Sequence, residues 1–508
     1  MATAITILFS LLIITDVVNS NMIFELKHKY DALPPRESMI ARWQNDQRRH
    51  GRSLSSVDVE VGAMGYMDTG SAYKLKFWVY IYWDEVIGTY KLIRFFSFPP
   101  CRLFFTNIMV GEPPKNYPLL IDTASDLTWL YCGGCKRCPS ASSFGFKIIH
   151  YMLEASKNGK KVKCSDPLCP LANNGTKTDL CTDDGICKYR VLYDASSVTS
   201  GYLVSDTITL NKVSGDSQTS QIPFEFKFGC GVDQFGGLES EPYAFNGHLG
   251  FAKTNISLLH QLSDAKLVKN TFCHCLRSDF KGGTFALGEV VTGKPLQTIP
   301  FVLEQLGFAV VTKLLQFGKL SLDITKSVTL IDISTSFNAF PNDTYNAIMD
   351  NIKSSHKNIN FSPPDPFVCF VFDGSIEDDF PKFTYHLEGG VELDLLPQQY
   401  LYENKPSEWC ITIDNSKSLP VNKDCIIIGA NVMVDKLVVY DIEKEVIGIV
   451  NYNCSSTIKM KDTKTGKAFN VQSHEITLDS KSKGVKIGGG IILVCLLSMI
   501  LNYFAFCY

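Results

Sequence analysis

Two stretches of the chain decide the fold, namely YPLLIDTASDLTWLYC at residues 117–132 and TLIDISTSFNAF at residues 329–340. In each stretch an apolar run leads into an aspartate that hydroxyl-bearing residues follow, first at Asp122 and then at Asp332. An apolar run bounded by turn residues predicts a buried strand, so we expect each carboxylate at the end of such a strand. Two carboxylates about 3 Å apart cannot both ionise and therefore share a proton. The pattern predicts that one acts as a base on water while the other polarises a peptide carbonyl.

The length and composition predict a folded body of two lobes around these stretches. The 508 residues are 45% hydrophobic and 20% charged, and the net charge is −3. The length fits two lobes with appendages, and the hydrophobic content excludes global disorder. The sequence has no basic stripe interleaved with aromatic residues, so we expect no nucleic-acid partner. From Leu103 onward, short alternating strands are punctuated by Gly and Pro, which predicts a mainly β fold.

Both ends of the chain carry apolar segments that predict export and anchoring. Residues 1–20 hold an apolar run near the start and end in small and polar residues, which is typical of a secretory signal peptide. Residues 487–508 are apolar and uncharged and are long enough to cross a bilayer. We expect a removable GPI signal or, as the alternative, a retained single-pass anchor, with residues 455–486 as a stalk. The protein would then pass through the secretory pathway to the extracellular face of the plasma membrane.

The cysteines and sequons agree with this route. The 17 cysteines of an exported chain predict disulfide bonds. Three of them form a CxxCxxC run without the fourth ligand of a zinc or iron-sulfur site, so we expect neither a metal nor a cofactor. Bridges are expected among the cysteines of one long segment: Cys132, Cys135, Cys138, Cys164, Cys169, Cys181 and Cys187. Five N-x-Ser/Thr sequons are candidate glycosylation sites: Asn174, Asn255, Asn342, Asn360 and Asn453.

The ordered motifs resemble the pepsin-like aspartic proteases, and within them the plant nepenthesin-like group. The two stretches quoted first are similar to the family's two active-site loops, and KYRVLYDASSVTSGYLVSDTITL is similar to its flap hairpin. The Cys-rich segment resembles the insertion of the nepenthesin-like group. The resemblance implies a bilobal, mainly β fold with a cleft between an N-terminal lobe at 103–291 and a C-terminal lobe at 297–454. Residues 21–102 would be an irregular pro-segment of a zymogen.

The resemblance also implies a role for individual residues in a monomeric enzyme that acts on a peptide or protein substrate. Asp122 and Asp332 would be the catalytic pair. Five residues would support them: Thr123 beneath the pair, Ser125 and Thr335 as donors to the outer carboxylate oxygens, and the flap residue Tyr193 in contact with Trp129. A disulfide would join Cys369 to Cys410.

A literal Asp-Thr-Gly-Ser tetrapeptide begins at Asp68, but it lacks the preceding apolar strand and the following Trp. Because context outweighs the tetrapeptide, we interpret Asp68 as a noncatalytic residue of the pro-segment.

Three residues of the active-site loops depart from the family pattern, in which Asp-Thr-Gly or Asp-Ser-Gly stands in both loops. Ala124 and Ser334 stand where the family has glycine, and Ile333 offers no hydroxyl, so we expect Thr123 to lose its partner. In a later motif His248 stands at a position that is usually apolar, and we interpret it as a packed, hydrogen-bonded histidine. These departures predict weakened turnover. They leave open a noncatalytic pepsin-fold protein, of the binding or inhibitor kind, or a surface glycoprotein with a structural role.

Overall fold

The computed structural model describes residues 22–28, 81–84, 89–92 and 104–475, the last range with gaps. The gaps are at 142–146, 174–179, 194–196, 217, 240–244, 279–281, 303–306, 326, 365–366, 417–424, 463–465 and 472–473. The signal peptide, Asp68, the sequon at Asn174, the end of the stalk and the apolar C-terminal tail lie outside the described residues. Within the described residues, no helix is long and apolar enough to span a bilayer.

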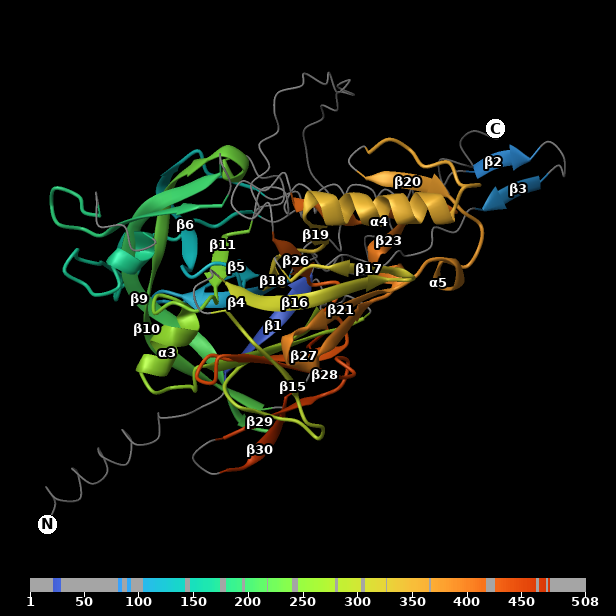
Figure 1. Cartoon of the computed structure of the whole chain (residues 1–508). Helices are drawn as coiled ribbons and strands as arrows, with labels where there is room; N and C mark the ends of the chain where they lie inside the picture. The colour runs from blue at the N-terminus through green and yellow to red at the C-terminus, as the bar shows by residue number, and fades with distance from the viewer. Residues whose placement is uncertain are drawn as a thin grey trace, which may run out of the picture. The chain divides into compact units, whose positions relative to one another are not determined.

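The described part of the chain is built mainly of strands, in agreement with the expected mainly β class (Figure 1). The elements up to the end of the first lobe are β1 (Met22–His28), β2 (Ile81–Asp84), β3 (Thr89–Leu92), β4 (Phe104–Val110), β5 (Lys115–Asp122), β6 (Trp129–Lys136), η1 (Leu153–Ala155), β7 (Lys160–Lys161), η2 (Pro170–Asn173), β8 (Lys188–Leu192), β9 (Val198–Gly215), β10 (Gln218–Phe235), η3 (Gly236–Leu238), β11 (Gly247–Gly250), α3 (Leu258–Asp264), β12 (Thr271–Leu276), β13 (Gly282–Leu287) and β14 (Val290–Val291).

The elements of the second lobe and of the segment after it are again mostly short strands. They are β15 (Gln297–Pro300), β16 (Phe308–Phe317), β17 (Leu320–Asp323), β18 (Val328–Asp332), β19 (Asn338–Phe340), α4 (Asn342–Ser355), β20 (Val368–Val371), α5 (Ile376–Asp379), β21 (Phe383–Leu387), η4 (Glu388–Gly390), β22 (Glu392–Leu395), α6 (Pro397–Tyr400), β23 (Leu401–Lys405), β24 (Glu408–Ile411), β25 (Ile413–Asn415), β26 (Ile426–Gly429), β27 (Lys436–Asp441), β28 (Val446–Asn451), β29 (Ile458–Lys461), β30 (Ala468–Val471) and β31 (His474–Glu475).

One large sheet runs through the first lobe and continues into strands of the second lobe. Its main path is β15-β28-β27-β12-β13-β1-β4-β5-β11-β6-β10-β9-β7, and β8 pairs with β9. A second sheet, in the order β22-β21-β16-β18-β26-β19-β25, forms the core of the second lobe, and α4 packs against β17, β19 and β25. The long green hairpin of β9 and β10 and the yellow helix α4 mark the two lobes in Figure 1. Strand β12 of the first lobe therefore pairs with β27 of the second lobe within one sheet.

The range expected to be a pro-segment contains a strand of this shared sheet. Strand β1 lies between β13 and β4, with Phe24 opposite Phe285 and His28 opposite Phe104. Strands β2 and β3 form a two-stranded hairpin. Residues 21–102 are thus not irregular throughout.

Six disulfides join cysteines of the described residues. The pairs are Cys132–Cys230, Cys135–Cys138, Cys164–Cys181, Cys169–Cys187, Cys275–Cys454 and Cys369–Cys410. The structure thus joins Cys369 to the partner that the resemblance implies. Cys132 instead pairs outside the Cys-rich segment, because β6 and β10 run side by side in parallel and bring its Cα within 5.4 Å of that of Cys230.

Candidate active site

The same backbone arrangement carries the candidate catalytic aspartate of each lobe. Asp122 ends β5 and lies opposite Gly250 of β11 in a parallel pair, and Asp332 ends β18 and lies opposite Gly429 of β26. The apolar runs stop at the aspartates, and the residues directly before them, Ile121 and Ile331, are buried. Both aspartates are themselves almost fully buried, with 0% and 1% of their surface exposed. A parallel strand pair therefore fixes each carboxylate at the end of a rigid element.

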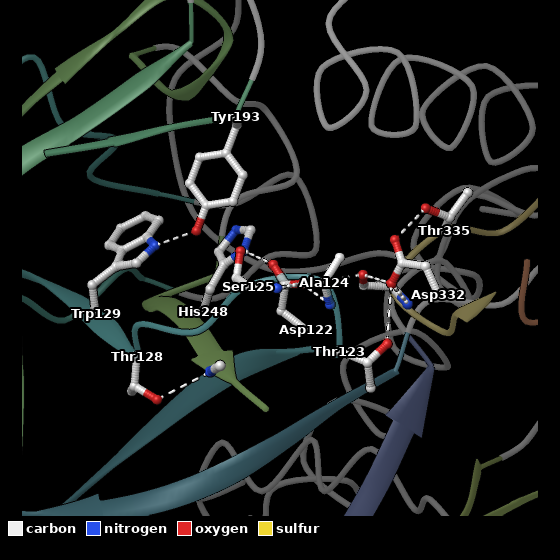
Figure 2. A network of polar contacts seen from close by, with 12 residues as sticks. Asp122, Thr123, Ala124, Ser125, Thr128, Trp129, Tyr193, His248, Asp332 and Thr335 are labelled. Atoms are coloured by element: carbon white, nitrogen blue, oxygen red, sulfur yellow. Dashed lines mark hydrogen bonds and ion pairs between the residues drawn. The ribbon is translucent and has the colours of Figure 1, made fainter. Parts of the chain in front are cut away.

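Backbone amides of the first loop hold Asp122 through one of its oxygens. The amides of Ala124 and Ser125 donate to Asp122 Oδ1 at 3.0 and 2.9 Å (Figure 2). We expected Ser125 to act through its hydroxyl on the outer oxygen, whereas this bond comes from its backbone and reaches Oδ1. Hydrogen bonds to a carboxylate favour the ionised form. The backbone of the first loop thus holds Asp122 Oδ1 in a fixed position.

Asp332 accepts hydrogen bonds from its own loop through both oxygens. The amide of Ser334 donates to Oδ1 at 2.9 Å, and the hydroxyl of Thr335 donates to Oδ2 at 2.7 Å. Thr335 therefore lies where the family resemblance implies a donor to the outer oxygen.

The hydroxyl of Ser334 connects the two carboxylates across the lobes. Its Oγ lies 3.4 Å from Asp122 Oδ1 and forms a short hydrogen bond with Asp332 Oδ1. One oxygen atom is thus in contact with the inner oxygens of both aspartates. This hydroxyl therefore links the two carboxylates through a single intervening atom. A serine at this position brings an extra hydroxyl into the space between them.

Thr123 keeps a partner across the lobes, which corrects the expectation drawn from the sequence. Its hydroxyl accepts a hydrogen bond from the backbone amide of Ile333 at 3.3 Å and donates to Asp332 Oδ1 at 3.2 Å. The amide is available whatever the side chain at position 333. The apolar side chain therefore removes one donor from the network beneath the pair without disconnecting Thr123.

The aromatic pair expected at the flap is close to the site. Trp129 Nε1 donates to the hydroxyl of Tyr193 at 2.6 Å, and Trp129 is fully buried. Tyr193 directly follows β8, the strand that pairs with the start of β9. The bond ties the end of this hairpin to the base of the site.

A residue that the sequence did not place in the site, His248, contacts the first aspartate. His248 lies in β11, and its Nδ1 is 3.2 Å from Asp122 Oδ2. Its ring stacks on Trp129 at a centroid distance of 5.1 Å, and the ring of Tyr193 lies 5.0 Å away (Figure 2). The sequence offered one signal: a polar residue two positions before Gly250, in a strand that is otherwise apolar.

A further, half-buried carboxylate interacts with Asp122. Burial raises the pKa of Asp126, and the charge of Asp122 contributes in the same direction, whereas a hydrogen bond from Thr254 opposes the shift. Within the described residues, no group of three or more acidic, His or Cys side chains could hold a metal ion.

Two family models cover most of the folded body. The N-terminal model of the xylanase inhibitors matches residues 104–289, and the C-terminal model of the same inhibitors matches residues 306–451. Aspartic proteinase 39 of Arabidopsis thaliana is 30% identical over 460 residues, which cover 89% of each chain. Aspartic proteinase 36 of the same plant is 30% identical over 501 residues, 97% of this chain and 95% of the relative.

Solved structures with a similar fold include two seed globulins. Conglutin gamma, a basic 7S globulin from lupine seeds, matches with a TM-score of 0.53 and 18% identity, over 68% of this chain and 91% of that one. The basic 7S globulin from soybean matches with a TM-score of 0.53 and 17% identity, over 69% of this chain and 91% of that one. At this identity the likeness concerns the fold alone.

Proposed function

Because the chain belongs to the plant family of pepsin-like aspartic proteases, we propose that it is an acid-active endopeptidase whose Asp122 and Asp332 activate water against a peptide bond. One observation carries the proposal: the hydroxyl of Ser334 contacts an inner oxygen of each carboxylate. Two buried carboxylates that share a partner can hold one proton between them. The site then contains a base and an acid at the same pH.

The proposed reaction needs no group beyond the two carboxylates and water. The ionised carboxylate takes a proton from water as the water oxygen bonds to the carbonyl carbon, and the protonated carboxyl gives its proton to the carbonyl oxygen. The tetrahedral intermediate then loses its C–N bond, and the amine nitrogen takes up a proton from the carboxyl that had acted as the base. One hydroxyl of the intermediate returns its proton to the other carboxylate, which gives the product acid and restores the starting pair. Tyr193 would cover the substrate from the flap and is held there through Trp129.

Peptide hydrolysis by the purified, glycosylated protein tests this function. Cleavage should be confined to acidic pH and blocked by a pepstatin-type inhibitor. The variants Asp122→Asn and Asp332→Asn should each lose at least about a thousandfold in kcat/KM, since either change removes one partner of the acid-base pair. Asp68→Asn should cleave like the natural protein. Undiminished cleavage by a folded Asp122→Asn or Asp332→Asn variant would overturn the proposal.

A noncatalytic binding protein is a second candidate, and the same serine supports it. The Oγ of Ser334 lies between the inner carboxylate oxygens, where it competes with water for the same hydrogen bonds. The main alternative to an enzyme is therefore a protein that binds peptides in its cleft without cleaving them. Such a protein would bind a pepstatin-type peptide in a calorimeter but show no hydrolysis at any pH.

We also propose that the protein is exported and held at the outer face of the plasma membrane. The apolar, uncharged residues 487–508 and the apolar start of the chain support this location. Phosphatidylinositol-specific phospholipase C should release the protein from intact cells. Retention of the protein, while a known GPI-anchored control is released, would favour a membrane-spanning anchor.

A further inference from the structure

The two lobes give an internal comparison for His248. In the first lobe His248 lies two residues before Gly250, the glycine opposite Asp122. In the second lobe Ile427 lies two residues before Gly429, the glycine opposite Asp332. Ile427 is fully buried and packs with Ala339. The repeated scaffold therefore accommodates an apolar side chain at this position, so an imidazole is not needed to build the strand.

The surroundings of His248 hold its ring against one carboxylate oxygen. The residue is 8% exposed, and its Nδ1 lies 3.2 Å from Asp122 Oδ2. Trp129 stacks nearly parallel to the ring, with an interplanar angle of 18°, and Tyr193 packs at 49°. An imidazole packed against two aromatic rings has little freedom to turn away. The contact with Asp122 is thus a fixed part of the site.

The charged and titratable groups around His248 come from several elements. Asp122 faces the ring from the end of β5, and the phenol of Tyr193 faces it from the flap side. Asp332 reaches Asp122 through the hydroxyl of Ser334. Asp126 interacts electrostatically with Asp122, and the charge of Lys253 acts on Asp126. Asp122 is therefore the carboxylate in direct contact with the imidazole.

We propose that His248 is a positioning residue that keeps Asp122 ionised through Oδ2, so that Asp122 is the base and the shared proton lies on Asp332. The inference rests on the proposed peptidase function. When it is protonated, the imidazole places a positive charge at hydrogen-bond distance from Asp122. A cation at hydrogen-bond distance stabilises the neighbouring carboxylate anion. His248 itself gains or loses no proton during the reaction, in which protons move only between water, Asp122, Asp332 and the substrate.

This role has a defined effect on the pH profile. Hydrolysis is lost at low pH when the anion of the pair is protonated and at high pH when the pair loses its last proton. The positive charge of His248 opposes the first event and favours the second. Both limbs of the profile should therefore lie at lower pH than they would without the imidazole.

Replacement by the residue of the other lobe tests the inference. In His248→Ile both limbs of the kcat/KM profile should move to higher pH by about 1 unit, the scale of a nearby opposite charge on a carboxylate. His248→Gln keeps a hydrogen-bond donor without the charge and should show a smaller shift. His386→Gln removes a histidine that pairs with Glu392 at the surface, and its profile should not change. Superimposable profiles for His248→Ile and the natural protein would overturn the inference.

A measurement without turnover separates this inference from the proposed function. In an NMR titration the His248 imidazole should titrate about 1 unit lower in Asp122→Asn than in the natural protein, because the variant removes the partner charge. An unchanged midpoint would refute the pairing whether or not the protein cleaves peptides. If the His248 midpoint is lowered in Asp122→Asn but the natural protein hydrolyses no peptide, the peptidase function is refuted. The pairing of His248 with Asp122 would still stand. The test also remains decisive if His248→Ile fails to fold.

Discussion

The first active-site loop, from Asp122 to Ser125, and the second, from Asp332 to Thr335, are built on the same backbone scaffold. In both lobes the aspartate ends one strand of a parallel pair and lies opposite a glycine of the other strand. Even the hydrogen bond that anchors this glycine is repeated. The amide of Gly250 donates to Thr128 at 3.0 Å in the first lobe, and the amide of Gly429 donates to Asn338 at 3.2 Å in the second.

The side chains on this scaffold differ between the lobes. The first loop keeps the hydroxyl of Thr123 after the aspartate and is contacted by His248. The second loop has Ile333 after its aspartate and directs the hydroxyl of Ser334 between the carboxylates. The scaffold thus fixes where the carboxylates lie, whereas a few neighbouring side chains decide how protons and water can use them.

The largest expected effect concerns the shared part of the scaffold, the two glycines. A Cβ at Gly250 would lie 2.5 Å from the carbonyl oxygen of Asp126, and a Cβ at Gly429 would lie 2.5 Å from that of Phe337. Gly250→Ala and Gly429→Ala should each lower the free energy of unfolding by about 3 kcal/mol, since rigid backbone must shift. Urea unfolding measures this loss. The control Gly293→Ala adds a Cβ where the structure describes no atom within 4 Å.

Equal losses in the two variants would support a duplicated scaffold. If only one glycine proved sensitive, the backbones of the two loops would not be equivalent.

The next effect arises where β12 of the first lobe pairs with β27 of the second lobe. His274 of β12 lies 3.1 Å from the hydroxyl of Tyr440 in β27, and burial together with the charge of Asp332 raises the pKa of Tyr440. Burial also lowers the pKa of His274 to about 3 from its ordinary value of 6.5. Below pH 6.5 the unfolded chain therefore binds a proton that the folded protein does not. The stability from this group is complete above pH 6.5 and falls as the pH falls toward 3.

His274→Gln should remove this dependence. Between pH 7 and pH 4.5 the natural protein should lose about 2 to 3 kcal/mol more unfolding free energy than the variant, as two units of separation imply. Chemical unfolding at the two pH values measures the difference. Parallel losses in both proteins would show that His274 is protonated in the folded state.

The smallest expected effect concerns the side chains that distinguish the loops. The double variant Ile333→Ser, Ser334→Gly gives the second loop the Asp-Ser-Gly pattern of the family. It also removes the hydroxyl that lies between the carboxylates. It should raise kcat/KM on a mixed peptide pool by about tenfold, or about 1.4 kcal/mol in transition-state free energy. Ala124→Gly in the first loop should have little effect, because the amide of Ala124 already donates to Asp122 at 3.0 Å.

If Ala124→Gly raised kcat/KM and the second-loop variant did not, the first loop rather than the second would limit turnover. If the natural protein shows no hydrolysis and the Ile333→Ser, Ser334→Gly variant does, the chain is a noncatalytic relative of the proteases.

The positions of Asp122 and Asp332 were predictable because an apolar run followed by hydroxyl residues is a local pattern. The contact of His248 was not, since it lies 126 residues from Asp122 and meets it only through the parallel pairing of β11 with β5. The partner of Thr123 was missed for a different reason. The side chain of Ile333 has no hydroxyl to offer, but the actual donor is its backbone amide, which every residue except proline provides.

The cysteines show the same limit. A dense run around Cys132 favoured local bridges, but Cys132 reaches Cys230 across 98 residues because β6 and β10 are neighbours in the sheet. Local spacing predicted that bridges form in this segment. It could not predict which strands would lie side by side.

The bridge between Cys275 and Cys454 joins β12 to the end of the second lobe across 179 residues. It closes the whole second lobe into a covalent ring. A single cut by a protease anywhere inside that ring would open a loop without separating two fragments, and the cut chain would migrate as one species until a reductant is added. The proposed peptidase would encounter other proteases outside the cell. After a cut inside the ring, the disulfide would keep both pieces of the second lobe, including the piece with Asp332, bound to the first lobe.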